Sequence, residues 1–226
     1  DDPKDVFIYD SKKHGHASWV YDSAGKRMHR PSFGRTFANP WHLSLVGTPR
    51  GVYAACNNRL HHGRVDAETG EVTWTLVDGT FPRPPDKIKY HYEFQPLLHD
   101  TKRDRLIQLK GDAERVDVYT RPLSEDGEWT QLQTTGKARI GREAVYIARH
   151  DTILWLNGRS LFALDCATNQ MKRVDVEMPK GLYSHECALV YDPTRDVCVA
   201  LIPRSFSGPM QTFLFRYDPD LATSEN

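Results

Sequence analysis

The sequence predicts an all-β protein, a β-propeller of four-stranded antiparallel blades, from three observations. First, an apolar or aromatic residue followed by Asp, or once by Thr, and then by a polar turn recurs five times. The residue before that Asp or Thr is Tyr21, Val65, Tyr119, Leu164 and Tyr217, so the steps are 44, 54, 45 and 53 residues. Second, the segments between turns are short and rich in Val, Ile, Leu and aromatic residues. Third, no stretch longer than about ten residues keeps a 3.6-residue period, so helix is a minor component.

Each period divides into four strands, named a to d in chain order. The clearest unit has strand a at 187–191, an Asp-Pro-Thr-Arg-Asp turn at 192–196, strand b at 197–201 and strand c at 212–217. The turn pattern Asp-x-x-Arg-Asp recurs at 100–104, and its residues suit β-turns. The remaining clear strands are predicted at 6–9, 71–76, 96–98, 105–109, 128–132 and 152–156.

The strands add up to 18, as b-c-d, three complete a-b-c-d units and a final a-b-c. We therefore expect one propeller domain or propeller segment with approximate units at 1–40, 41–85, 86–140, 141–183 and 184–226. Open sheet edges invite aggregation, so a propeller closes on itself. Two interpretations stay open: a small closed ring of about five blades, or part of a larger propeller.

Two strand d segments carry a tryptophan, Trp74 and Trp129, after a polar turn. This phrase resembles kelch-type and galactose-oxidase-like propeller repeats, and residues 65–76 also resemble quinoprotein propeller repeats. The Gly-Gly doublet of kelch repeats is missing at the ends of strand b. No residues match the copper or quinone sites of these families, so the resemblance implies a fold and not a chemistry.

The composition excludes some classes of partner. The 30 basic and 30 acidic side chains cancel, which argues against nucleic acid, and no apolar run approaches the length of a membrane span. The chain begins without Met or a signal-peptide pattern, so we expect a processed chain or a piece of a longer one. The compartment stays open, and a secreted or periplasmic location is the favoured hypothesis. Cys187 and Cys198 fall on adjacent predicted strands, and both the free and the paired state are open.

The face of the blades that carries the d–a and b–c connections is the predicted binding face, because these connections are long and irregular. Near the starts of strand a, His42, Glu93, Glu143 and Glu186 lie 51, 50 and 43 residues apart, at about one blade position. Carboxylates and imidazoles that converge there suit a divalent cation, or acid–base catalysis on a sugar.

The candidate residues fall into three overlapping sets. The candidate catalytic residues are Glu93, Glu143 and Glu186. The candidate metal ligands are Glu93, His91, His185 and Glu186. The candidate binding residues are His42, His91, Arg142, His185, Arg59, Tyr92, Trp41, Arg159 and Arg204. No cofactor other than a possible divalent cation is implied by these patterns.

Three functions of different classes fit these patterns. The leading hypothesis is a binding or interaction propeller that recognises a carbohydrate or a protein on the d–a/b–c face. The first alternative is a carbohydrate-active enzyme, a lyase or hydrolase, that uses the Glu and His residues near the channel mouth. The second is a structural domain of a larger protein with further blades or domains outside this segment. Strand ends at a solvent-filled channel are polar in any propeller, which keeps the structural interpretation open.

Overall fold

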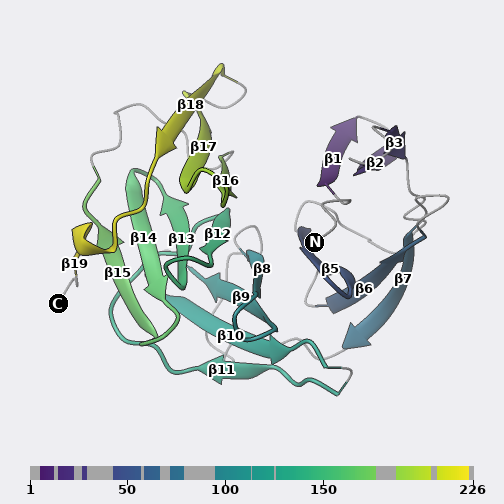
Figure 1. The fold of residues 1–226 in the computed structure, drawn as a ribbon, viewed down its shortest axis with the longest axis horizontal. Coiled ribbons are helices and arrows are strands. Elements are labelled where there is room, and N and C mark those ends of the chain that lie inside the picture. Colours follow the sequence, from purple (N-terminus) through teal and green to yellow (C-terminus); the bar gives the residue numbers. More distant parts are fainter. Residues whose placement is uncertain are drawn as a thin grey trace. The chain divides into compact units, whose positions relative to one another are not determined.

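The computed structural model describes residues 6–12, 15–22, 27–29, 43–56, 59–66, 72–78, 95–112, 114–124, 126–176, 187–204 and 208–223. Its strands form five antiparallel sheets, here called blades 1 to 5, and each blade runs up and down in chain order (Figure 1). The chain divides into two compact units, Asp1–Arg83 with blades 1 and 2, and Pro84–Asn226 with blades 3 to 5.

The first unit contains two sheets. Blade 1 consists of β1 (Val6–Lys12), β2 (Gly15–Asp22) and β3 (Arg27–His29). Blade 2 consists of β4 (Ser44–Thr48), β5 (Gly51–Cys56), β6 (Arg59–Val65) and β7 (Val72–Asp78). Strand β5 lies between β4 and β6 and is buried from Val52 to Cys56.

The second unit contains three sheets. Blade 3 consists of β8 (Leu97–Asp100), β9 (Arg105–Gly111), β10 (Val116–Pro122) and β11 (Thr130–Leu132). Blade 4 consists of β12 (Ala144–Ile147), β13 (Thr152–Asn157), β14 (Ser160–Asp165) and β15 (Gln170–Val174). Blade 5 consists of β16 (Ala188–Asp192), β17 (Val197–Pro203) and β18 (Met210–Phe215).

The predicted all-β fold with four-stranded antiparallel blades is confirmed, and the 18 expected strands are present as the 18 strands of blades 1 to 5. A further two-residue strand, β19 (Ala222–Thr223), was not predicted. It follows a short 3-10 turn at Pro219–Leu221 and pairs with β15, the outer strand of blade 4. In the described part of the chain no helix is both long and apolar enough to cross a membrane.

The first strands of blades 3, 4 and 5 are neighbours. Strand β12 lies between β8 and β16 (Figure 1). Blade 4 is therefore packed on both faces, and its strands alternate between two cores. Ile153 and Trp155 face a core shared with blade 3, whereas Leu154 and Leu156 face a core shared with blade 5. This double burial explains why blade 4 is apolar at successive positions.

The cysteines are free thiols, and all four are buried. Strand register explains why Cys187 and Cys198 do not pair. Ala188 stands opposite Leu201, and Cys198 stands opposite Tyr191. Cys187 therefore lies level with a residue near position 202, roughly 13 Å along the strand from Cys198, beyond the reach of a disulfide.

Candidate functional site

Most of the predicted site falls outside the described residues. These are Trp41, His42, His91, Tyr92, Glu93, His185 and Glu186. All four predicted metal ligands are among them, so the divalent cation stays a prediction. Within the described residues there is no group of three or more His, Cys, Asp or Glu side chains that could hold a metal ion.

Glu143 is the one predicted catalytic residue that the structure describes, and it immediately precedes β12. Three left-handed residues at equivalent turns, Asp104, Asp151 and Asp196, set the blade register at steps of 47 and 45. The counterparts of position 143 are therefore 96 and 188. Glu93 and Glu186 come three and two residues before these numbers in sequence, and both lie outside the described residues.

The connection that leads to Glu143 is held tightly to blade 4. Trp155 Nε1 donates to the Arg139 carbonyl at 2.8 Å, and the Asn157 side-chain amide donates to the Ile140 carbonyl. Gly141 passes so close to the Leu156 carbonyl that a Cβ would collide with it. Ile140 is 1% exposed. Glu143 is thus positioned by a rigid segment, as a site residue requires.

Glu143 is partly buried where it precedes β12. Burial raises its pKa to about 7, and the neighbouring Arg142 guanidinium offsets part of this rise. The Cys187 thiol shares this environment, because its pKa is raised to about 12 by burial first and by the Glu143 charge second. Near neutral pH the Glu143 carboxyl can therefore either donate or accept a proton or a hydrogen bond.

The predicted arginines lie in different settings. Arg159 is exposed in the tight turn between β13 and β14, next to Gly158 with φ of 60°. The Arg204 guanidinium follows β17 and donates from Nε and Nη2 to the Gln211 side-chain oxygen at 2.6 and 2.7 Å, in the amide orientation that satisfies both groups. Arg204 therefore bridges the two sides of its b–c connection. Arg59 begins β6 in the first unit and is exposed.

Lys110 is a residue that the sequence analysis missed. Its side chain is fully buried in β9, and burial lowers its pKa to about 7. The signal was a lysine at the end of the apolar run Leu-Ile-Gln-Leu-Lys at 106–110. A lysine after a buried strand usually extends to solvent, so the sequence alone favours an exposed position.

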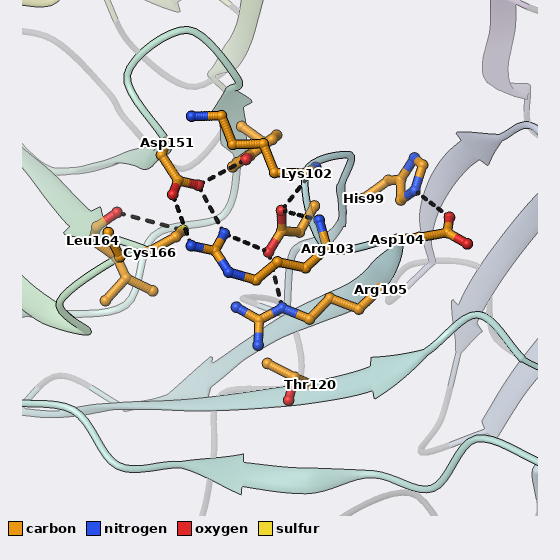
Figure 2. Close-up of polar contacts among 12 residues, drawn as sticks. His99, Lys102, Arg103, Asp104, Arg105, Thr120, Asp151, Leu164 and Cys166 are labelled. Carbon is orange, nitrogen blue, oxygen red and sulfur yellow. Dashed lines mark hydrogen bonds and ion pairs between the residues drawn. The ribbon is translucent and has the colours of Figure 1, made fainter.

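The opposite face of the second unit carries a network of ion pairs at the a–b turns (Figure 2). The Arg103 guanidinium of blade 3 donates two hydrogen bonds to the Asp151 carboxylate of blade 4, at 2.9 and 2.7 Å. The Tyr146 hydroxyl donates to the same carboxylate at 2.8 Å. Asp100, fully buried, accepts from Arg103 Nη1 and from Arg105 Nε at 3.1 and 2.9 Å.

A related contact joins blade 4 to blade 5. Arg149 of blade 4 donates to Asp196 of blade 5 at 2.7 Å, and the Tyr191 hydroxyl donates to that carboxylate at 2.8 Å. Asp151 and Asp196 have positive φ angles of 53°, so each carboxylate sits on a fixed left-handed turn residue. These charged side chains join neighbouring blades at the a–b turns.

Comparison with known proteins gives a fold and no family. No family model matches the chain, and neither does any curated protein. A solved structure from Bacteroides fragilis, provisionally assigned as a 6-phosphogluconolactonase, matches with a TM-score of 0.59 and 12% identity, over 99% of this chain and 67% of the other. A structure of a protein from Lactobacillus plantarum matches with a TM-score of 0.50 and 14% identity, over 97% of this chain and 80% of the other.

At these identities the likeness concerns the fold alone. It agrees with the blade architecture, and the kelch-type resemblance stays a prediction because no family model supports it. The chain thus has a β-propeller-like fold with neighbours among solved structures.

Proposed function

We propose that this protein is a ligand-binding propeller that recognises a carbohydrate on the d–a/b–c face of its second unit, beside Glu143. The observation that carries the proposal is the environment of the Glu143 carboxyl, which burial brings to a pKa of about 7 at the start of an inner strand. A carboxyl kept near its midpoint at neutral pH costs stability, and such groups are concentrated at functional sites.

The contrast between the two faces supports this choice of site. On the a–b turn face, Arg103, Asp151 and Asp196 form ion pairs between blades. On the d–a/b–c face, the segment before Glu143 is fixed by Trp155 and Asn157, which pre-organises the carboxyl. A rigid, half-protonated carboxyl suits a ligand with hydroxyl groups, because a hydroxyl both donates and accepts hydrogen bonds.

The proposal is tested by calorimetric titration of the wild type and the Glu143→Gln variant with neutral and uronic-acid oligosaccharides. The panel also includes a sugar lactone, since the Bacteroides fragilis neighbour is provisionally assigned as a lactonase. We expect binding that changes between pH 6 and 8, around the Glu143 pKa of about 7, and that loses this pH dependence in Glu143→Gln. Glu128→Gln, an exposed residue of the c–d connection, is the matched control.

Binding that is identical in wild type and Glu143→Gln at every pH contradicts the site. A second outcome is that no member of the panel binds, whereas a protein ligand is captured and binds more weakly to Glu143→Gln. In that case the ligand is a protein and not a carbohydrate. A chain that binds neither is a structural domain, which overturns the proposal.

A carbohydrate-active enzyme is the second candidate, and the pKa of Glu143 favours it specifically. A carboxyl with a pKa near 7 is protonated often enough to act as a general acid on a glycosidic oxygen. Glycoside hydrolysis needs a second carboxylate at about 5 to 9 Å, and Glu93 and Glu186 are the candidates for it. Release of reducing ends or unsaturated products, abolished in Glu143→Gln, distinguishes this enzyme from a binding protein.

A further inference from the structure

Blade 5 exposes one apolar face of its sheet. Val190, Val199 and Leu214 stand directly opposite one another across β16, β17 and β18. Val190 is 54% exposed and Leu214 is 70% exposed. Met210 lies on the same face of β18, four residues before Leu214, and is 51% exposed. The other face of this sheet packs against blade 4 in the second core.

The equivalent rows of blades 3 and 4 are covered. In blade 3 the row is Leu98, Ile107 and Thr120, and in blade 4 it is Val145, Leu154 and Ala163. Leu98 and Ile107 belong to the core shared by blades 3 and 4. Leu154 and Ala163 belong to the core shared by blades 4 and 5, and Val145 packs against it. In each case the row faces the blade that follows in the chain.

The ion pairs at the a–b turns also join each blade to the blade that follows it in the chain. Arg103 of blade 3 pairs with Asp151 of blade 4, and Arg149 of blade 4 pairs with Asp196 of blade 5. Arg195 holds in blade 5 the turn position that Arg103 holds in blade 3, one residue before the left-handed Asp. Both arginines contact the first Asp of their own turn, and Arg195 does so with Asp192 at 2.8 Å.

Arg195 differs from Arg103 in its exposure. Its side chain is 78% exposed, whereas that of Arg103 is 33% exposed. An exposed arginine and an exposed apolar row therefore occur together on blade 5, at the two positions through which blade 3 binds blade 4.

We propose that the face formed by Val190, Val199, Met210 and Leu214 is the docking surface for a further blade of the same repeat, which places a turn carboxylate on Arg195. This blade belongs to a polypeptide longer than the 226 residues described. Exposed apolar patches of this kind mark interaction sites, and the two contact types already seen between blades 3, 4 and 5 fix the chemistry of the occupant. The Bacteroides fragilis and Lactobacillus plantarum structures support a longer chain, because this chain covers 67% and 80% of them.

The test compares two proteins, the 226-residue chain and the product of its complete reading frame, each carrying Leu214→Cys. The four native thiols are buried, so a maleimide reagent reports on the introduced thiol. In the 226-residue chain we expect the labelling rate of an exposed thiol. In the complete product we expect labelling to be about tenfold slower or more, because reagent then enters only through local opening.

Arg195→Met, added to both proteins, tests the charge. It should accelerate labelling in the complete product and leave the rate in the 226-residue chain unchanged. Arg103→Met is the matched control, because its partner Asp151 lies within the 226 residues, and it should lower the melting temperature of both proteins alike. Circular dichroism melts establish that each variant is folded before it is labelled.

Three outcomes overturn the proposal. The first is equal labelling of Leu214→Cys in the two proteins. A reading frame that ends at Asn226 counts as this outcome, because the two proteins are then identical. The second is protection of Leu214→Cys in the monomeric 226-residue chain. The third is protection that appears with rising concentration as the chain dimerises, which makes a second copy the occupant.

Discussion

The Arg103 guanidinium and the Asp151 carboxylate form a two-bond ion pair between consecutive blades, across 48 residues of sequence. The pair is geometrically specific because the two guanidinium nitrogens meet the two carboxylate oxygens. Its surroundings are partly dry, since the Asp151 side chain is 14% exposed. Asp151 in turn holds the Tyr146 hydroxyl of its own blade. The blades of the second unit are therefore joined by apolar cores and by a polar contact at their turns.

Removal of the Arg103 charge should separate these contributions. Arg103→Met roughly keeps the length of the side chain, removes the guanidinium from Asp151, and leaves Asp100 with Arg105 alone. We expect a loss of roughly 1–3 kcal/mol in the free energy of unfolding, measured by urea titration. Arg149→Met is the comparison, since Arg149 is 67% exposed and makes a single hydrogen bond to Asp196, so its loss should cost less. Equal costs would show that the two-bond geometry adds nothing.

Acid should destabilise the second unit through Asp151. The Arg103 hydrogen bonds hold the pKa of Asp151 at about 2, below the usual aspartate value of 3.8, despite the opposing effect of burial. A carboxylate with a lowered folded-state pKa stabilises the fold above its unfolded pKa and loses this contribution as the pH falls. We expect roughly 2 kcal/mol to disappear between about pH 4 and pH 2. The free energy of unfolding, measured by urea titration at each pH, should change less with pH in Asp151→Asn than in wild type over this range. An identical pH dependence in the two proteins refutes the assignment.

The sequence was sufficient for the blades because strand and turn chemistry are local. Strand-like runs bounded by Asp, Gly and Pro place β13, β16, β17 and β18 within a few residues. It was insufficient for β19, because two residues give no period and the strand exists only through its pairing with β15. The repeated Asp-x-x-Arg-Asp turn was visible, but its partner Asp151 was not, since the turn at 148–151 lacks the first Asp.

The candidate site was less predictable than the fold for a related reason. The position of Glu143 near a strand start could be read from the blade period, but its burial and its effect on the Cys187 thiol, 44 residues away in sequence, could not. The burial of Lys110 likewise depends on packing that its neighbours in sequence do not reveal. Burial at these positions depends on tertiary packing, which a single sequence specifies only through the complete fold.

Glu143 should give the protein the opposite response to pH from Asp151. Its folded-state pKa is raised to about 7, so between roughly pH 4.5 and pH 7 the folded state holds a proton that the unfolded state has lost. Stability should therefore fall as the pH rises through this window, by at most about 1.4 kcal/mol per pH unit. Melting curves of wild type and Glu143→Gln from pH 5 to pH 8 test this. The variant should be the more stable protein at pH 8, and a variant that is equally destabilised by rising pH excludes Glu143 as the cause.

Gly141 and Gly158, two glycines near Glu143 in sequence, should respond differently to alanine. At Gly141 a Cβ would collide with the Leu156 carbonyl, which is held in the central strand β13, so neither group can move without disturbing blade 4. At Gly158 a Cβ would meet open space, and the cost comes only from the left-handed φ of 60°. We expect Gly158→Ala to lose about 1 kcal/mol and Gly141→Ala to lose more than about 2 kcal/mol in urea unfolding. Gly141→Ala should also weaken ligand binding, because it shifts the segment that carries Arg142 and Glu143, whereas Gly158→Ala should leave it intact. If both variants lose the same stability, the close approach at Gly141 does not position the site.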